Sequence, residues 1–180
     1  MAPPSLLAEL EAYARRWPLE GAPPRFLEFA RRQPRCFERS TREGHFTGSA
    51  WLVSADGERV LLTHHRKLDR WLQLGGHADG DADLGRVALR EAEEESGLGA
   101  LALEPGIFDL DRHRIPARGA EPEHWHYDVR YVVRAGEDER FVVGAESHAL
   151  AWRRIADVAA DAQADDSLRR MARKWLARGG

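Results

Sequence analysis

The sequence predicts a mixed α/β fold in which helices cover a mixed β-sheet. The chain has 180 residues and a mass of 20.3 kDa, which fits one domain of ordinary size. Apolar residues make up 43% and charged residues 32%, so the chain can build a core and is unlike a disordered protein. Helical and strand periodicities also alternate along the chain, which favours a sheet packed against helices.

Two short helices are expected before the sheet. Six of the nine prolines fall before residue 40 and divide this segment into short pieces. Ser5 can cap a first helix that Pro18 ends, and a second helix is expected after Pro24. The first helix has an apolar stripe formed by Leu6, Leu7, Leu10, Tyr13, Ala14 and Trp17. We therefore expect residues 1–40 to form a helical extension packed on a core domain of residues 41–180.

The rest of the chain alternates between strand and helix patterns. A hairpin is expected around Asp56 and Gly57, because β-forming residues flank this turn signal on both sides. Asp83 is a candidate N-cap and Gly97 a candidate stop for a central helix. The expected strands are residues 45–54, 58–65, 71–76, 107–115, 124–134 and 148–155, with a short turn after the last strand and an amphipathic helix at 166–178.

Charge, cysteine content and hydropathy exclude several classes of protein. Lys and Arg total 27 against 30 for Asp and Glu, a net charge of −3, which lacks the basic excess of a general nucleic-acid or membrane-surface binder. Cys36 is the single cysteine, so an intrachain disulfide and a cysteine-built zinc cage are excluded. The sequence shows no membrane-spanning apolar run and no signal-peptide pattern at its start. We expect a cytoplasmic protein with no membrane partner.

An acidic cluster in the central helix is the most informative feature. At about 100° per residue, Glu91, Glu94 and Glu95 fall within an arc of about 100°, whereas Glu93 points the other way. The same sector holds three apolar residues, Leu84, Val87 and Leu98. Most glutamate runs form a solvated face, and that is the alternative interpretation. The apolar neighbours indicate instead that these three carboxylates face the protein.

Carboxylates gathered on an inward face need a counter-charge. Like charges at these spacings repel, and burying them uncompensated costs several kcal/mol. A hard divalent cation removes both penalties, and carboxylate oxygens suit Mg²⁺, which commonly bridges to substrate phosphates. Gly75 and Gly76 precede the helix and allow close backbone approach, so a carbonyl oxygen there can join the metal ligands.

Residues 76–98 resemble the signature of Nudix hydrolases. That pattern is a glycine, five residues, a glutamate, seven residues, then Arg-Glu-apolar-x-Glu-Glu-x-Gly-apolar. Gly76 matches the opening glycine. The closing block is matched at the family's spacing by Arg90, Glu91, Ala92, Glu94, Glu95, Gly97 and Leu98. The departure is Ala82, which stands where the family usually has its first glutamate, and Asp81 and Asp83 are the candidates to replace that residue.

The resemblance implies a fold, a cofactor and a reaction. The fold would be an α/β/α sandwich with a mixed β-sheet, spanning roughly residues 41–160, with the N-terminal helices as an extension. Glu91, Glu94 and Glu95 would bind Mg²⁺ or Mn²⁺ together with the carbonyl of Gly76, and Arg90 would orient Glu91. Water would attack phosphorus in a nucleoside diphosphate linked to another moiety, with the metal activating the water and a carboxylate taking the proton.

Glu146 is a further candidate for the catalytic machinery. Members of this family often place an additional acidic residue in a loop before a late strand that carries a tryptophan. Glu146 precedes such a strand, which contains Trp152. We expect Glu146 to be an extra metal ligand or the general base, and the alternative is that it is an ordinary loop residue.

The strand at residues 124–134 separates apolar from polar side chains. One face carries Trp125, Tyr127, Val129, Tyr131 and Val133, and the other carries His124, His126, Asp128 and Arg130. In the preceding strand Asp109, Asp111 and His113 also share a face. A polar outer face is one interpretation. A sandwich covers both faces of its sheet, however, so we predict His126, Asp128 and Arg130 as substrate contacts in a cleft.

Other basic and histidine residues are weaker candidates. Lys67 follows the second strand and is a candidate contact for a substrate phosphate, with a solvated turn as the alternative. His64, His65 and His77 raise the question of zinc. No histidine pair has the spacing of a helix-borne site, and carboxylates dominate, so Mg²⁺ is the better prediction.

Three functions remain open at this level. The favoured one is a metal-dependent hydrolase whose partner is a small nucleotide or another diphosphate, with no long nucleic acid expected. The alternative is a non-catalytic, Nudix-like nucleotide-binding module, for which Ala82 is the only support in the sequence. A prenyl-diphosphate isomerase on the same scaffold is disfavoured, since that chemistry is expected to use a cysteine near the metal and Cys36 lies too early. Neither the substrate nor the oligomeric state follows from the sequence.

Overall fold

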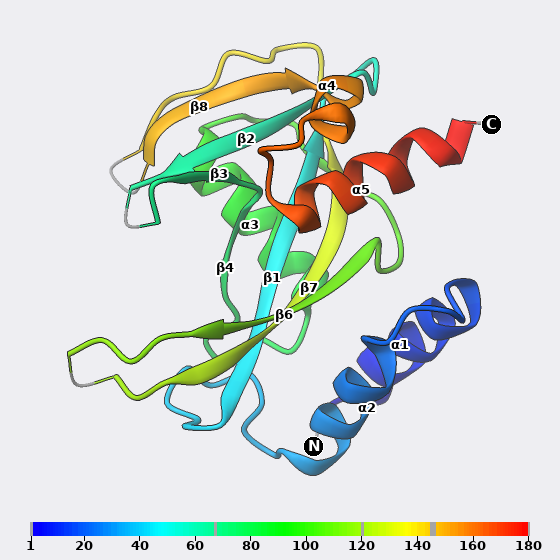
Figure 1. The fold of residues 1–180 in the computed structure, drawn as a ribbon, viewed down its shortest axis with the longest axis vertical. Coiled ribbons are helices and arrows are strands. Elements are labelled where there is room, and N and C mark those ends of the chain that lie inside the picture. Colours follow the sequence, from blue (N-terminus) through cyan, green and yellow to red (C-terminus); the bar gives the residue numbers. More distant parts are fainter. Residues whose placement is uncertain (1, 67, 120, 145–146, 180) are drawn as a thin grey trace.

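The computed structural model describes residues 2–66, 68–119, 121–144 and 147–179, and Figure 1 shows its fold. The helices are α1 (Pro4–Arg16), α2 (Pro23–Arg32), α3 (Leu84–Ser96), α4 (Ile155–Ala160) and α5 (Asp166–Leu176), followed by the 3₁₀ turn η1 (Ala177–Gly179). The strands are β1 (Gly44–Val53), β2 (Arg59–His65), β3 (Arg70–Leu72), β4 (Leu74–His77), β5 (Ala102–Leu103), β6 (Asp109–Ile115), β7 (His124–Arg134) and β8 (Ser147–Arg154).

Strand β1 is the centre of a mixed sheet. It pairs in parallel with β7 along its whole length, from Gly44 opposite Trp125 to Val53 opposite Arg134. It also pairs antiparallel with β2 and β4, and β6 pairs antiparallel with β7. All ten residues of β1 are buried. The predicted fold class, a mixed sheet between helices, is confirmed.

Helix α3 and the N-terminal helices share one side of the sheet. Gly48 of β1 lets α3 approach closely, since a Cβ atom there would lie 2.7 Å from the carbonyl oxygen of Leu84. The aromatic rings of α2 pack on the same face: Phe29 stacks on Tyr127 with ring centroids 3.9 Å apart, and Phe26 meets Tyr127 edge-on. The expected helices before the sheet are therefore present, and their side chains are part of the main core.

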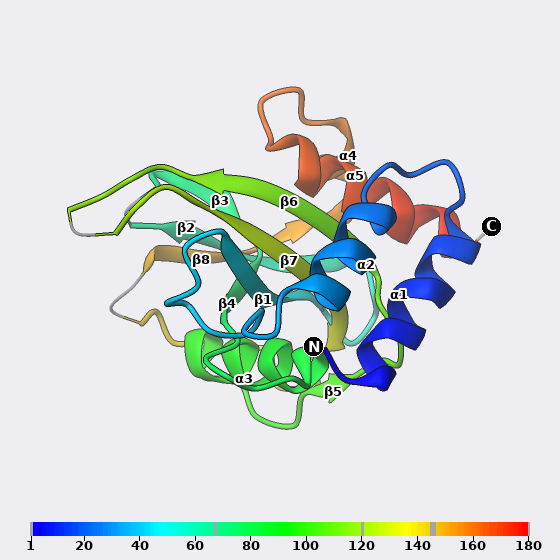
Figure 2. The same cartoon turned by 90° about the horizontal axis from the view of Figure 1, so that it is seen from below.

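Helices α4 and α5 cover part of the opposite side, as Figure 2 shows. A second core lies beneath them, where Trp51 of β1 and Val132 of β7 pack with Leu168 and Met171 of α5. Toward the N-terminal ends of β1 and β7 the same face of the sheet becomes polar. There it carries His45 and Thr47 of β1 and, opposite them, His126 and Asp128 of β7. None of the described helices is both long enough and apolar enough to cross a membrane.

Four local expectations differ from the structure. Ser5 was expected to cap the first helix, but α1 begins at Pro4, and its N-cap, Pro3, makes no side-chain hydrogen bond. Residues 71–76 were expected as one strand but form parts of β3 and β4, because Trp71 and Leu72 pair with β2 whereas Leu74 onwards pairs with β1. The expected turn after β8 is the helix α4. The two-residue strand β5 was not expected, since a strand this short gives no periodic signal.

Candidate active site

Helix α3 begins and ends at the residues that the sequence indicated. Asp83 caps it by accepting a hydrogen bond from the backbone N–H of Arg86 at 3.0 Å, and Gly97 ends it in the left-handed conformation with φ 68°. The carboxylate of Asp81 binds the Arg86 guanidinium, with 2.7 Å from Nη2 to Oδ1. Ala82 packs against the core. Both aspartates therefore support the start of the helix beside the position where the family glutamate is missing.

The glutamates of α3 lie along strand β4. Glu91 packs directly against Gly76, where an added Cβ would lie only 2.3 Å from Oε2 of the carboxylate. Glu95 accepts the backbone N–H of Gly75 at 2.8 Å. Both are half-buried, whereas Glu94 is exposed. The prediction that these carboxylates face the protein is therefore confirmed for Glu91 and Glu95 and is wrong for Glu94, whose side chain is exposed at the surface.

Arg90 joins this helix to the strand. Its guanidinium donates from Nη2 to Oε1 of Glu91 at 3.0 Å and to the carbonyl oxygen of His77 at 3.3 Å. The bond to Glu91 is the main reason why the pKa of Arg90 is raised, so the guanidinium stays charged. Arg90 is therefore placed to fix the orientation of the Glu91 carboxylate, the role that the family resemblance implies.

The donor set of this region suits a hard divalent cation. Glu91 lies beside Gly76 and Glu95 binds the backbone of Gly75, and the missing side chain at Gly76 is what lets Glu91 reach the strand. Mg²⁺ and Mn²⁺ prefer carboxylate and carbonyl oxygens. The residues present therefore fit the cation that the sequence predicted, although their roles as ligands stay a prediction.

A buried polar cluster lies on the other face of the sheet. The carboxylate of Asp128 accepts hydrogen bonds from Thr47 at 2.8 Å, Ser49 at 2.7 Å and Gln73 at 3.2 Å, and from Nε of Arg130 at 2.7 Å. Asp128 and Arg130 are each only 2% exposed. These hydrogen bonds connect β7 to β1 and to Gln73, the residue between β3 and β4.

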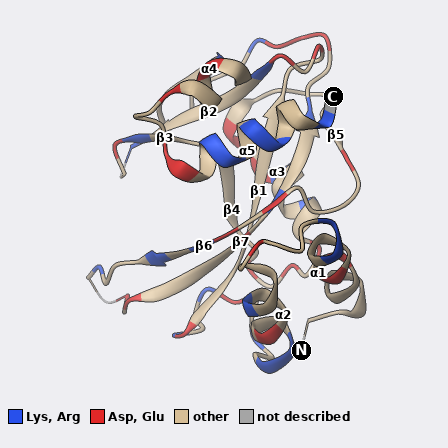
Figure 3. Cartoon of the chain, turned by 45° about the vertical axis from the view of Figure 1, so that its right-hand side comes forward, with Lys and Arg blue, Asp and Glu red and all other residues tan. Residues whose placement is uncertain are grey.

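The cluster continues to helix α5. Arg130 also lies 3.4 Å from Asp109 and 3.5 Å from Asp111. Asp109 is fully buried, and its carboxylate forms ion pairs with two residues of α5, Arg170 at 2.7 Å and Lys174 at 2.6 Å. The basic residues of α5 are visible in Figure 3. We call Asp109, Asp111, Asp128, Arg130, Arg170 and Lys174 the aspartate network. The predicted substrate contacts Asp128 and Arg130 belong to this network, and a role for them in substrate binding stays a prediction.

Histidine side chains gather at the end of this polar face. His126 lies with its ring centroid 4.8 Å from His45, 5.2 Å from His77, 5.2 Å from His124 and 5.4 Å from His113. Burial, followed by the neighbouring histidines, lowers the pKa of His45 to about 4 and that of His126 to about 2. Burial also lowers the pKa of His77. These rings are therefore neutral near pH 7.

His45 was not predicted from the sequence as a member of this group. His45 stands in a strand of ordinary composition, and only its register opposite His126 reveals the group. Lys67 and Glu146 lie outside the described residues. His64 packs instead against Trp71 and His148, with ring centroids 5.2 and 5.6 Å away.

Comparison with solved structures shows the same fold in several hydrolases. A hydrolase of the NUDIX family from Clostridium perfringens is 26% identical, with 76% of this chain and 98% of that chain covered and a TM-score of 0.56. A C. elegans Ap4A hydrolase in a binary complex is 17% identical, with 74% and 96% covered and a TM-score of 0.58. The MutT NUDIX hydrolase from Burkholderia pseudomallei is 23% identical, with 73% and 98% covered and a TM-score of 0.56.

The family assignment comes from the sequence model of the NUDIX domain. No curated protein matches the chain significantly. The NUDIX domain model, in contrast, matches residues 45–175, which is most of the chain and includes β4, α3, β7 and all of β1 except Gly44. The resemblance read from residues 76–98 is thereby confirmed. The chain belongs to the Nudix family and is a Nudix hydrolase that acts on pyrophosphate bonds.

Proposed function

We propose that this protein is a metal-dependent hydrolase that cleaves the pyrophosphate linkage of a nucleoside diphosphate joined to another moiety. The observation that carries the proposal is the packing of Glu91 and Glu95 against the Gly75–Gly76 backbone. This packing gathers carboxylate oxygens beside the backbone of β4, on the side of the sheet that α3 covers. Such a set of hard oxygen donors is what a cation that bridges to phosphate oxygens requires.

The proposed ligands of Mg²⁺ or Mn²⁺ are Glu91, Glu94, Glu95 and the carbonyl oxygen of Gly76. The bound ion would neutralise phosphate oxygens and lower the pKa of a water molecule that attacks phosphorus. Arg90 holds the Glu91 carboxylate in place, and the backbone N–H of Gly75 holds that of Glu95. Glu146 is proposed as an extra ligand or the general base.

The proposed substrate is a small nucleotide rather than a long nucleic acid. The substrates of Nudix hydrolases are nucleoside diphosphate derivatives, and the solved structures that share this fold include an Ap4A hydrolase. The proposed contacts are His126, which is half-buried at the end of the polar face, and Lys67. Asp128 and Arg130, the other two contacts predicted from the sequence, are each 2% exposed and bonded within the aspartate network, so we propose that they hold the polar face in place behind His126.

We also propose the bounds of the catalytic domain and the compartment in which it acts. Residues 1–40 would act as a helical extension of a catalytic domain at 41–180. A reducing, cytoplasmic compartment is proposed because Cys36 is the single cysteine of the sequence. Cys36 is fully buried, and burial raises the pKa of its thiol to about 11, which argues against the isomerase chemistry considered above.

Hydrolysis of a substrate panel tests the proposal. The full chain is incubated with Mg²⁺ and nucleoside triphosphates, nucleotide sugars, ADP-ribose or dinucleoside polyphosphates, and the products are separated by chromatography. We expect Mg²⁺-dependent cleavage of at least one compound, and a loss of roughly 10²- to 10⁴-fold in Glu95→Gln, since both water activation and proton removal depend on the carboxylate group.

Glu93→Gln is the matched control, because Glu93 is an exposed glutamate of the same helix. It should retain the activity of the unchanged protein. Equal losses in the Glu93 and Glu95 variants, or no cleavage of any compound by folded protein, would contradict the proposal.

A further inference from the structure

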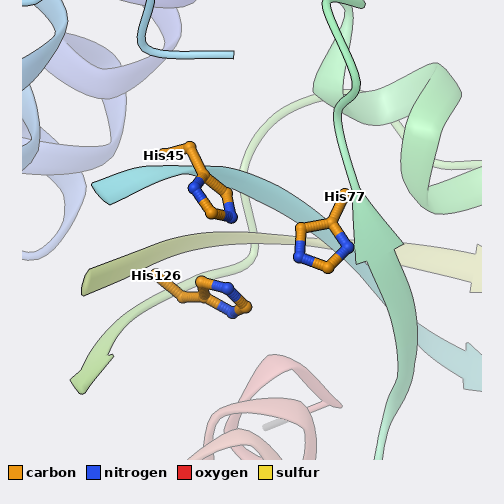
Figure 4. Close-up of side chains that lie close together, drawn as sticks. All are labelled: His45, His77 and His126. Carbon is orange, nitrogen blue, oxygen red and sulfur yellow. The ribbon is translucent and has the colours of Figure 1, made fainter. Parts of the chain in front are cut away.

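Three imidazole side chains from separate strands share one space on the polar face of the sheet. They are His45 of β1, His77 of β4 and His126 of β7. One nitrogen atom from each ring can be chosen so that all three lie within 4.8 Å of one another. Figure 4 shows the rings of the three histidines turned toward the same space. Three nitrogen donors at such separations match the ligand set of a transition-metal site.

His45 provides the second, independent observation. Its side chain is only 1% exposed, and neither Nδ1 nor Nε2 has a hydrogen-bond partner among the described residues. A buried polar group without a partner costs free energy, and native proteins rarely leave one in that state. A metal ion bound by one of these nitrogens removes part of that cost. The orphaned ring therefore points to an occupant of the space that it faces.

The sheet holds the three donors in a fixed arrangement. His45 and His126 are direct register partners in the parallel pair β1–β7, and His77 lies opposite Thr47, two residues along β1. The carbonyl oxygen of His77 accepts a bond from Arg90, which fixes the backbone at that ligand. Donors carried by paired strands need little reorganisation when an ion binds.

We propose that His45, His77 and His126 form a nitrogen-ligated site for Zn²⁺, distinct from the carboxylate site on α3. Imidazole nitrogen suits zinc and related first-row ions, whereas Mg²⁺ prefers oxygen. Three protein ligands leave one position of a tetrahedral zinc ion for water or a substrate oxygen. His77 follows Gly76 directly in β4, so the nitrogen site lies on the opposite face of that strand from the proposed carboxylate site.

The neighbouring histidines flank the three ligands. His124 Nε2 lies 3.3 Å from His126 Nε2, and its Nδ1 lies 2.9 Å from the carbonyl oxygen of Pro122. His113 Nδ1 lies 3.1 Å from Oδ2 of Asp111. Each of these rings therefore has a partner of its own. We assign the ligand set to His45, His77 and His126 because one nitrogen of each lies within 4.8 Å of the other two.

Metal binding by the intact chain tests this site independently of hydrolysis. The protein is stripped with a chelator, saturated with excess Mg²⁺ and titrated with Zn²⁺ in a calorimeter, and the bound metal is counted by mass spectrometry. We expect one Zn²⁺ per chain that Mg²⁺ does not displace. Co²⁺ in place of Zn²⁺ should give the visible absorption bands of a four- or five-coordinate nitrogen site.

Single variants identify the ligands. His77→Gln and His126→Gln should each weaken Zn²⁺ binding by more than about 100-fold, because even the outer hydrogen-bond partners of metal ligands contribute about 10- to 100-fold. His148→Gln is the matched control, since His148 is an exposed histidine on β8, and its Zn²⁺ affinity should be unchanged. Zinc binding that survives both ligand variants but disappears in Glu91→Gln would overturn the proposal, since the ion would then occupy the carboxylate site.

Diffraction from crystals of the unchanged protein grown with Zn²⁺ covers the case in which a histidine variant fails to fold. An anomalous peak among the three rings supports the site. A peak only at the glutamates of α3, or no peak, overturns it. Neither result decides whether the protein hydrolyses nucleotides with Mg²⁺, so the two proposals can fail separately.

Discussion

Two groups of three carboxylates occupy opposite settings in this molecule. The glutamates of α3 lie at the surface beside the backbone of β4, and Glu94 is exposed. The aspartates of β6 and β7 lie under α5, where Asp109 is fully buried and Asp128 is 2% exposed. The aspartates are bonded to Arg130, and Asp109 also to Arg170 and Lys174. One group is thus open to ions from solution, and the other is enclosed with cations of the chain.

This contrast separates a binding site from a structural network. Burying a carboxylate costs several kcal/mol unless a counter-charge accompanies it. The aspartate network has its counter-charges within the fold, from Arg130 of β7 and from Arg170 and Lys174 of α5, so the network fastens that helix to the sheet. The glutamate group is positioned by backbone contacts at Gly75 and Gly76 and by Arg90 of the same helix, which binds Glu91. We infer that the aspartate network contributes to stability and that the glutamates of α3 contribute to function.

Breaking the aspartate network should give the largest change in stability. Asp109→Ala removes a carboxylate that forms ion pairs with Arg130, Arg170 and Lys174. These buried or half-buried cations then lose one of their counter-charges. Removing one partner of a buried ion pair costs about 3–5 kcal/mol. We expect the free energy of unfolding in urea to fall by about that amount.

Asp138→Ala is the control for this measurement. Asp138 forms an exposed ion pair with Arg140, and exposed pairs contribute little. The free energy of unfolding should stay nearly unchanged in this variant. If the free energy of unfolding falls by a similar amount in Asp109→Ala and Asp138→Ala, burial does not determine how much an ion pair stabilises this protein. The contrast between the two groups of carboxylates would then be wrong.

The two groups also differ in how far the sequence reveals them. Glu91, Glu94, Glu95 and Gly76 lie within twenty residues on one helix and the strand before it, so local spacing was enough to group them. Alternation placed Asp128 and Arg130 on the correct face of β7, but it could not show that Arg170 and Lys174 would meet that face. His45 and His126 become neighbours only through the parallel pairing of β1 with β7, which depends on long-range packing.

A substitution at Gly76 tests the role of the glutamates of α3 in the same comparison. In Gly76→Ala the new Cβ would lie 2.3 Å from Oε2 of Glu91, and the carboxylate, as the end of a flexible side chain, must move away. The fold should therefore survive while the proposed ligand is displaced. A displacement of about 1 Å can cost about 100-fold in rate. We expect Mg²⁺-dependent hydrolysis to fall by about that factor, measured on the substrate found in the panel.

Gly99→Ala is the matched control, because nothing lies within 4 Å of an added Cβ at that position. It should keep both activity and stability. If Gly76→Ala keeps full activity, Glu91 does not need to lie against β4 for catalysis. If it unfolds the protein, the glutamate group contributes more to stability than the comparison implies.

The smallest effect is confined to acid pH and concerns Asp111. Burial alone would raise the pKa of this carboxyl group, but His113, Arg130 and Arg170 together hold the pKa well below its usual range. A carboxyl group with a lowered pKa in the folded state stabilises the protein above its unfolded pKa of about 3.9 and loses that contribution as the pH falls. The free energy of unfolding should therefore decrease as the pH is lowered through this region, and Asp111→Asn should make the decrease shallower. An unchanged acid slope in urea titrations of the variant would show that Asp111, although part of the aspartate network, does not link its stability to pH.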